Sequence, residues 1–374
     1  MPYSYRVIDF FHPVKSSRLI GALLFLFEIS FFSFSMLKCL VITPAFPPTV
    51  NGVQDFSNIL ASALSMETTV EFCVLPLSSS SEKTILRVFN SFSMVHLHYV
   101  GYGYSTRGMP GNLIRALEKW KQNKKNQLLV TFHELFAVSN IPWTSSFYLQ
   151  KYQKFLFLRL SKIADYAIAS GHVFEPHFTS PTFKLPVFSN IPAPTFVIPF
   201  EMRNDYAVLW GNLEAKRKAY SLLEKYYDHI TQRWKWTKII DIGVVDPSPP
   251  IMPVPIIHLG FLSTIEISCI LSSCKYGILT AYSPDYFCKS GVFAAFAAHG
   301  LAVLAGTSKN YYFACLDGLF ADFHFQKMDE DVYESASFLA SNLRKWYAGH
   351  DILAHVNLIY QPIIRHFARN HFRY

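Results

Sequence analysis

Residues 39–64, which read CLVITPAFPPTVNGVQDFSNILASAL, decide the fold of this chain. The first five of them form an apolar run with the length of a buried strand. A proline-rich loop follows, and from Val53 to Leu64 apolar residues recur at the spacing of one helix face. A buried strand that leads through a loop into an amphipathic helix begins a βαβ unit. The segment therefore predicts a parallel sheet covered by helices.

The alternation of apolar runs and amphipathic stretches continues to Ala305 and indicates two doubly wound, Rossmann-like α/β domains. The proline-rich residues 181–199 interrupt it and are the predicted linker, with an N-terminal domain at 37–200 and a C-terminal domain at 201–374. A terminal helical stretch from Asp331 is expected to pack back on the N-terminal domain. The predicted strands are 39–43, 72–75, 94–97, 128–132, 166–169, 206–209, 239–242, 258–260, 276–279 and 301–305, and the predicted helices are 53–64, 113–121, 147–163, one ending at 222, 265–272 and 290–299.

Length, composition and charge narrow the classes of protein. A chain of 374 residues suits two domains better than one. Hydrophobic residues make up 51% of it and charged residues 16%, a balance that excludes a disordered chain. The net charge of +8 fits three kinds of anionic partner: lipid, a phosphate-bearing ligand or nucleic acid. No zinc-finger or RNP-type signature is present, so nucleic acid is not expected as a partner.

The cysteines show no CxxC pair. Most of them stand in apolar strand or helix contexts, where a free thiol behaves as a small hydrophobe. Neither a disulfide framework nor a zinc site is predicted, and a reducing, cytoplasmic compartment fits best. The six are Cys39, Cys73, Cys269, Cys274, Cys288 and Cys315.

The first 36 residues form an N-terminal extension. Residues 19–34 are apolar apart from Glu28 and a few serines, and basic residues precede them, as in a weak signal anchor. However, Met36 leads directly into the first predicted strand, which leaves no linker between a bilayer and the core. We interpret 1–36 as an upstream extension, with Met36 as a candidate start. A membrane-surface helix is the second interpretation and a spanning helix the third.

The first loop between strand and helix lacks the GxGxxG pattern, which disfavours a dinucleotide-binding dehydrogenase. Asn51 and Gly52 precede the helix that begins near Val53. Free N–H groups and the helix dipole suit phosphate or sugar oxygens at such a position. The alternative is a glycine that only makes a turn.

Five short motifs occur in the order in which the large bacterial family of group 1 glycosyltransferases carries them. They are 44–53 (PAFPPTVNGV), 95–98 (VHLH), 131–134 (TFHE), 188–192 (FSNIP) and 259–262 (LGFL). The chain resembles a divergent bacterial member of this family. The resemblance implies the GT-B fold, two Rossmann-like domains with an interdomain cleft. It also implies transfer of a sugar, of the hexosyltransferase type, from a nucleotide-sugar donor with retention of configuration and without a metal or other cofactor.

His133 and Glu134 are the candidate catalytic residues. His133 stands at the C-terminal end of a predicted strand, where open α/β sheets bind ligands. The resemblance makes it the histidine that contacts the transferred sugar. The alternative is a histidine that caps the strand or borders the core. His96 and His98 belong to another strand, and we assign them mainly to structure.

The first loop of the second domain is expected to bind the donor diphosphate. In the family this loop carries a Gly-Arg pair and a lysine, whereas this chain has Asn212 in place of the arginine. Lys216 and Arg217 stand at the start of the next helix, followed by Lys218. Positive charge there opposes the helix dipole unless an anion binds, so Lys216 and Arg217 are predicted phosphate ligands. A solvated basic helix start is the alternative.

Residues 282–300, YSPDYFCKSGVFAAFAAHG, resemble the donor-binding loop and helix of the family. The family has two glutamates here, and the second holds the donor ribose; in this chain Phe287 and Ala295 occupy their places. Lys289 and Ser290 stand at the helix N-terminus, where a serine cap, free N–H groups and a lysine suit a diphosphate. They complete the predicted donor site, and the alternative is a plain capped helix.

Two classes of function follow. The first is a retaining sugar transferase with a carbohydrate or lipid-linked acceptor, which serves polysaccharide or glycolipid assembly at the cytoplasmic membrane. The second is a GT-B-like scaffold that has lost donor binding; a GT-B-type sugar epimerase is a further alternative. The aromatic, basic residues 147–162 either pack on the sheet with snorkelling lysines, which we favour, or lie peripherally on anionic lipid.

Overall fold

The computed structural model describes residues 37–44, 52–67, 70–77, 81–137, 139, 141–170, 178, 182–280, 284–306, 319, 321–322 and 336–371. The predicted N-terminal extension and Asn51 lie outside these residues. Among the described helices, none combines the length and the apolar character that crossing a membrane requires. Among the described residues, Cys39, Cys269, Cys274 and Cys288 take part in no disulfide.

The first sheet has six parallel strands in the order β2-β1-β3-β4-β5-β6. Because β2 pairs with one edge of β1 and β3 with the other, the direction in which strands are added reverses between β1 and β3. Ligands of open α/β sheets bind at the carboxyl ends of strands beside such a reversal. The strands are β1 (Leu37–Pro44), β2 (Val70–Leu77), β3 (Met94–Tyr99), β4 (Gln127–Phe132), β5 (Tyr166–Ala169) and β6 (Thr182–Lys184).

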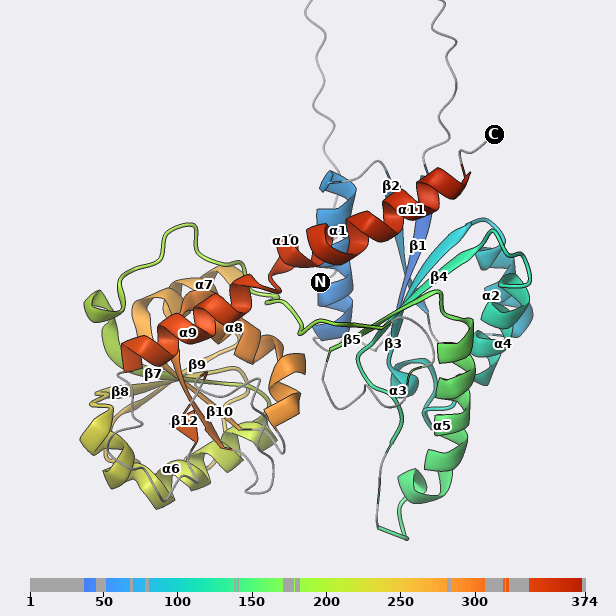
Figure 1. Cartoon of the computed structure of the whole chain (residues 1–374). Helices are drawn as coiled ribbons and strands as arrows, with labels where there is room; N and C mark the ends of the chain where they lie inside the picture. The colour runs from blue at the N-terminus through green and yellow to red at the C-terminus, as the bar shows by residue number, and fades with distance from the viewer. Residues whose placement is uncertain are drawn as a thin grey trace, which may run out of the picture. The chain divides into compact units, whose positions relative to one another are not determined.

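Helices cover both faces of the first sheet (Figure 1). Ile85 of α2, Leu117 of α4 and Leu156 of α5 share one buried cluster with the strands. Phe56 and Leu60 of α1 belong to the cluster on the other face. The helices are α1 (Gly52–Glu67), α2 (Glu82–Phe89), α3 (Gly101–Tyr104), α4 (Gly111–Trp120) and α5 (Ser145–Ile163).

The second sheet is also parallel, in the order β12-β11-β10-β7-β8-β9. In chain order, β8 and β9 are added on one side of β7, and β10, β11 and β12 are added on its other side. Its switch point therefore lies between β7 and β10. The strands are β7 (Asn204–Trp210), β8 (Lys238–Ile242), β9 (Ile256–Gly260), β10 (Cys274–Thr280), β11 (Ala302–Gly306) and β12 (Ala321–Asp322).

Helices also cover both faces of the second sheet. Leu223 of α6 packs in one cluster, and Leu271 of α7 and Phe296 of α8 pack in another. After α9, the π-helical turn His355–Tyr360 brings the hydroxyl of Tyr360 to 3.4 Å from both Thr131 Oγ1 and His96 Nε2 of the first sheet. The helices are α6 (Leu213–Arg233), α7 (Thr264–Ser273), α8 (Gly291–His299), α9 (Ala336–Ala348), α10 (Ile352–Ala354) and α11 (Gln361–His371).

The strands and helices predicted from sequence are confirmed, but the short helix α3 and the short strand β12 were not predicted, and three further differences stand out. Residues 182–184 form the edge strand β6 inside the proline-rich stretch that was predicted to be only a linker. Helix α6 continues to Arg233, because no glycine or proline stops it at 222. Helix α2 was not predicted; Ser81 caps it, and only Ile85 and Phe89 of its residues are buried.

Candidate functional site

A pocket of about 730 Å³ lies at the switch point of the second sheet. Trp210 at the end of β7 and Thr280 at the end of β10 both line it. Thr280 also donates a hydrogen bond from Oγ1 to the carbonyl of Ala215 at 3.0 Å, which ties the end of β10 to the first turn of α6. The topology therefore places the pocket between two helix N-termini, those of α6 and α8.

The N-terminus of α8 forms one wall of this pocket. Ser290 is the N-cap residue, as predicted, and its hydroxyl accepts a hydrogen bond from the N–H of Phe293 at 3.1 Å. Lys289 and Ser290 both line the pocket, and the ammonium group of Lys289 lies 5.4 Å from the ring centroid of Tyr286. Because the first-turn N–H groups of a helix have no intrahelical acceptor, this wall presents donors and positive charge to an anion.

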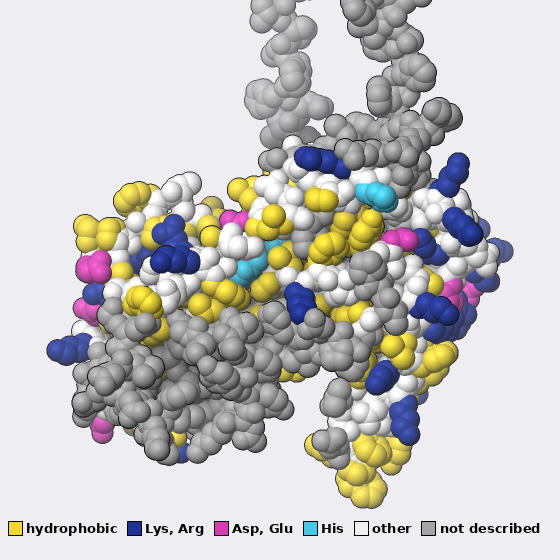
Figure 2. Space-filling view, in the orientation of Figure 1, with side chains coloured by type: hydrophobic (Ala, Val, Ile, Leu, Met, Phe, Trp, Pro, Cys, Tyr) yellow, Lys and Arg dark blue, Asp and Glu magenta, His cyan; other side chains and the backbone are white. Residues whose placement is uncertain are grey.

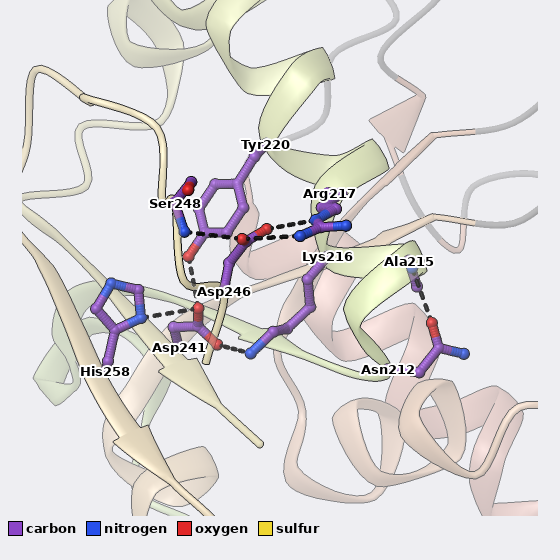
Figure 3. Close-up of polar contacts among 9 residues, drawn as sticks. All are labelled: Asn212, Ala215, Lys216, Arg217, Tyr220, Asp241, Asp246, Ser248 and His258. Carbon is purple, nitrogen blue, oxygen red and sulfur yellow. Dashed lines mark hydrogen bonds and ion pairs between the residues drawn. The ribbon is translucent and has the colours of Figure 1, made fainter. Parts of the chain in front are cut away.

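The start of α6 forms the opposite wall. Asn212 caps the helix by accepting a hydrogen bond from the N–H of Ala215 at 2.8 Å (Figure 3). Lys218 lines the pocket and forms an ion pair with Glu214 at 2.7 Å. Asn212 is thus a helix cap, and Lys218, one turn further along, reaches the pocket together with its partner Glu214, which also lines it.

The two predicted phosphate ligands of α6 are occupied elsewhere. Lys216 is completely buried and forms an ion pair with Asp241, and Arg217 pairs with Asp246 at 2.6 Å (Figure 3). Neither side chain is part of the pocket wall. The carboxylates neutralise both cations without a ligand, so a role of Lys216 or Arg217 in phosphate binding stays a prediction.

Asp241 is the centre of a buried polar network. It accepts a hydrogen bond from the hydroxyl of Tyr220 at 2.7 Å, in addition to its ion pair with Lys216. His258 Nδ1 lies 3.0 Å from the same carboxylate (Figure 3). The network joins α6, β8 and β9, and its groups satisfy one another as buried charges require.

His133 and Glu134 follow β4 directly, near the switch point of the first sheet. The N–H of His133 donates to the carbonyl of Tyr99 at 3.1 Å. Burial, and to a lesser extent the positive charge of Lys289, lowers the pKa of His133 to about 3. Burial raises the pKa of Glu134, and the positive charge of Lys289 opposes this shift. The charge of Lys289 therefore acts on both the pocket and the predicted catalytic pair.

Gly52 is the first residue of α1, and its carbonyl accepts a hydrogen bond from Asn190 Nδ2 at 3.1 Å. This contact joins two of the motifs that were quoted from the sequence. Asn51 lies outside the described residues, so the glycine loop as a ligand site stays a prediction.

Sequence reasoning missed several residues of the pocket. Trp210, Lys218, Thr280 and Tyr286 belong to its wall. Lys218 could have been found, because it completes the basic run that was recognised, and Tyr286 lies in the quoted segment 282–300. Trp210 and Thr280 required the strand order. In the described part of the chain, no group of three or more His, Cys, Asp or Glu side chains is arranged to hold a metal ion.

Comparison with known proteins gives structural likeness alone. No family model and no curated protein sequence matches this chain. Among solved structures, an α-glucosyltransferase in complex with UDP-glucose and abasic-site DNA has a TM-score of 0.53 and 11% identity, covering 88% of this chain and 99% of that one. A trehalose-6-phosphate synthase gives the same four values. A trehalose-6-phosphate structure from E. coli bound with UDP-2-fluoro glucose has a TM-score of 0.52 and 10% identity, covering 88% and 98%.

The fold is GT-B. The match covers 88% of this chain and 99% of both the α-glucosyltransferase and the trehalose-6-phosphate synthase, and the two doubly wound parallel sheets agree with this fold. Phe287 and Ala295 stand where the family that the sequence resembles has glutamates. Phe287 lines the pocket and stacks on Phe293 with ring centroids 5.0 Å apart, and Ala295 is fully buried. Both side chains pack in apolar surroundings.

Proposed function

We propose that this protein transfers a sugar from a nucleoside-diphosphate sugar to a carbohydrate or lipid-linked acceptor, with retention of configuration. The observation that carries the proposal is the pocket at the second switch point, with Lys289 and Ser290 on one wall and Lys218 on the other. Lysines and helix N–H groups can stabilise the negative charge that develops on a departing diphosphate. The proposal gives this task to these groups rather than to a metal.

Two neighbours support the choice of donor. One was solved with UDP-glucose and another with UDP-2-fluoro glucose, so uridine nucleotides are the first donors to test. The chemical class of the acceptor is less well defined, because one neighbour was solved with DNA. Our expectation that nucleic acid is not a partner therefore stays a prediction, and acceptor screens should include DNA.

A catalytically inactive scaffold is the second candidate. The apolar residues Phe287 and Ala295 favour it. They stand where the group 1 family that the sequence resembles has glutamates, and the second of those glutamates holds the donor ribose. The two candidates differ in one property that can be measured, which is the affinity for nucleoside diphosphates.

Lys289→Ala is expected to weaken UDP binding about 10- to 100-fold while it changes the melting temperature little. A charge-assisted hydrogen bond contributes about 1.5–3 kcal/mol, whereas a lysine before a helix N-terminus is repelled by the dipole by about 0.3–1 kcal/mol. Titration calorimetry gives the affinity. Thermal unfolding gives the stability, and a nucleotide at 100 times its Kd should add about 2.7 kcal/mol to the wild type.

Lys235→Ala is the matched control for this experiment. Lys235 is exposed and precedes β8, at the end of the sheet opposite the pocket, so its loss changes the net charge equally without touching the site. Equal affinities of Lys289→Ala and Lys235→Ala would contradict the assignment of Lys289. Absence of binding of any nucleotide to the wild type would favour the scaffold.

The outer face of α5 supports peripheral contact with an anionic membrane. Trp143, just before the helix, is 89% exposed, and Tyr148 and Phe155 project from the helix as exposed aromatics. Lys151 and Lys154 lie between them, and α5 contains no acidic residue. Figure 2 shows hydrophobic side chains at the lower end of this helix, with Lys or Arg side chains nearby. Exposed aromatics next to lysines are the composition of membrane-surface helices.

The full chain is therefore expected to bind vesicles that contain phosphatidylglycerol and not vesicles of phosphatidylcholine alone. Lys151→Ala/Lys154→Ala should weaken this binding about tenfold or more, since each lysine near an anionic surface contributes about 1 kcal/mol. Vesicle flotation measures it, at low salt and at 1 M salt, where the Debye length is about 3 Å. Phe196→Ala, at an exposed aromatic outside α5, is the control. Vesicle binding that depends neither on lipid charge nor on Lys151 and Lys154 would contradict a membrane-contacting surface on α5.

A further inference from the structure

Two buried histidines are joined at the carboxyl ends of β3 and β4. In the parallel register His98 pairs with Thr131, so His133, two residues further along, can reach back beside it. His98 Nδ1 lies 3.0 Å from His133 Nε2, and the two rings are inclined by 22°. A hydrogen bond between two ring nitrogens needs one proton, so one of these two atoms carries it and the other presents a lone pair.

Both rings are neutral near pH 7. Burial lowers the pKa of His98 well below its usual range and that of His133 to about 3. Phe56 packs edge to face against both rings, with centroids 5.8 and 5.4 Å away. A neutral imidazole carries a single proton, so the position of the shared proton fixes the tautomer of both residues.

Two other buried histidines show which nitrogen is left without a partner. His355 Nε2 lies 2.9 Å from the carbonyl of Pro186, which can only accept, so Nε2 carries the proton. Its Nδ1, the lone-pair atom, is buried with no hydrogen-bond partner among the described residues. His350, which donates to the carbonyl of Trp346, likewise has a buried, partnerless second nitrogen. In both, the unsatisfied atom is the acceptor, because the other nitrogen holds the single proton of the neutral ring. This agrees with the rule that an orphaned buried N–H is rarer than an orphaned acceptor.

The same reasoning applies to His98. Its Nε2 is buried and has no hydrogen-bond partner in the described part of the chain. If Nε2 carried the proton, an N–H would be buried unpaired at the full desolvation cost. The proton therefore belongs on His98 Nδ1, which donates to His133 Nε2, and the proton of His133 must be on Nδ1. The backbone of His98 is fixed as well, because Tyr104 donates its hydroxyl to the His98 carbonyl at 2.8 Å.

We infer that His98 is a positioning residue that holds His133 in the Nδ1–H tautomer, so that His133 acts as a hydrogen-bond donor and not as a general base. An Nδ1–H group recognises an oxygen acceptor such as a sugar hydroxyl. It cannot remove a proton from an acceptor substrate, because its only lone pair is bound by His98. The identification of the ligand as a sugar rests on the proposed function; the tautomer does not.

Nitrogen-15 NMR of the histidine rings tests the tautomer without any ligand. In wild-type protein labelled at its histidines, Nδ1 of His98 and of His133 should be of the protonated type and Nε2 of both of the unprotonated type. A His133→Asn spectrum assigns the His133 signals. Protonated Nε2 on His133 in the wild type would overturn the inference, and this result requires no folded variant of His98.

Two substitutions separate positioning from packing. His98→Leu removes the donor, and His133 should then populate the Nε2–H tautomer. His98→Asn can place an amide N–H near the position of Nδ1 and should keep the wild-type pattern at His133. His366→Leu, at an exposed histidine of α11, is the control and should leave the His133 signals unchanged. An unchanged His133 tautomer in His98→Leu would overturn the inference.

Ligand binding gives a second readout. Affinity for a nucleotide sugar, measured relative to the nucleoside diphosphate alone, should fall about 10- to 100-fold in His98→Leu, the range for residues that orient another histidine. His98→Asn should restore most of it. Equal relative affinities in wild type and His98→Leu, in a protein that binds the nucleotide, would count against the donor role. Failure of the wild type to bind nucleotides would instead contradict the proposed function and leave the NMR result standing.

Discussion

Replacing Asp241 with alanine is expected to lower the free energy of unfolding by about 3–5 kcal/mol, the cost of leaving a buried charge without its partner. Lys216 and Asp241 are both sealed from solvent. The substitution would leave an ammonium group in the core and would also remove the hydrogen-bond acceptor of Tyr220 and the partner of His258. Unfolding in urea, followed by fluorescence, measures the change.

Asp246→Ala is the matched control, because Asp246 forms the neighbouring ion pair of the same helix. Its partner Arg217 is 56% exposed, so water can solvate the guanidinium when the carboxylate is removed. Exposed ion pairs contribute about 0–1 kcal/mol, and the hydrogen bond that Asp246 accepts from Ser248 adds a similar amount. Asp246→Ala should therefore cost less than Asp241→Ala.

A double substitution tests the cause of the loss. Adding Lys216→Met to Asp241→Ala removes the unpaired charge and is expected to restore about 2 kcal/mol or more. If the double variant is as unstable as Asp241→Ala, or if the two aspartate variants lose the same stability, the buried charge is not the source of the effect.

Most of the fold followed from the sequence because it depends on short-range patterns. An apolar run such as β4, followed by an amphipathic helix such as α5, is visible within 40 residues. The edge strand β6 was missed because three residues are too few to show a period. Helix α2 was missed because it is short and only two of its residues are buried.

The candidate site was harder to predict because its contacts are distant in sequence. Lys216 and Arg217 were proposed as phosphate ligands from their place at a helix start. Their carboxylate partners are 25 and 29 residues away in sequence, and no local sequence pattern indicates these ion pairs. By contrast, Lys289 and Ser290 were assigned to a helix N-terminus from local residues and from a family resemblance, and the structure finds both in the lining of the pocket.

The proposed role of His98 was also hard to predict, because its contact with His133 is distant in sequence. From its place on or just after a strand, His98 was assigned mainly to structure, and it is buried in β3. Its hydrogen bond to His133 spans 35 residues and depends on the register between β3 and β4. The register between two such parallel strands cannot be obtained from their apolar pattern, because side chains on both faces of each strand are buried.

The last prediction concerns His133 itself. His133→Ala is expected to lower sugar transfer about 100- to 1,000-fold, the range observed when one preorganised hydrogen-bond donor is removed from an active site. Affinity for the nucleoside diphosphate should stay the same, because the pocket that we propose for it is lined by residues of the second sheet and its helices. Release of nucleoside diphosphate from the donor measures the rate, and calorimetry measures the affinity.

Two comparisons decide between a donor and a packing residue at this position. His133 is buried against Phe56, so the alanine variant will also lose some stability, which its melting temperature records. His133→Asn keeps an N–H donor in a smaller side chain and should be more active than His133→Ala at similar stability. If nucleotide affinity falls as far as the transfer rate, His133 supports the fold of the site. If the rate falls alone, the lost interaction was one made with the reacting sugar, because only such an interaction lowers turnover without weakening nucleotide binding.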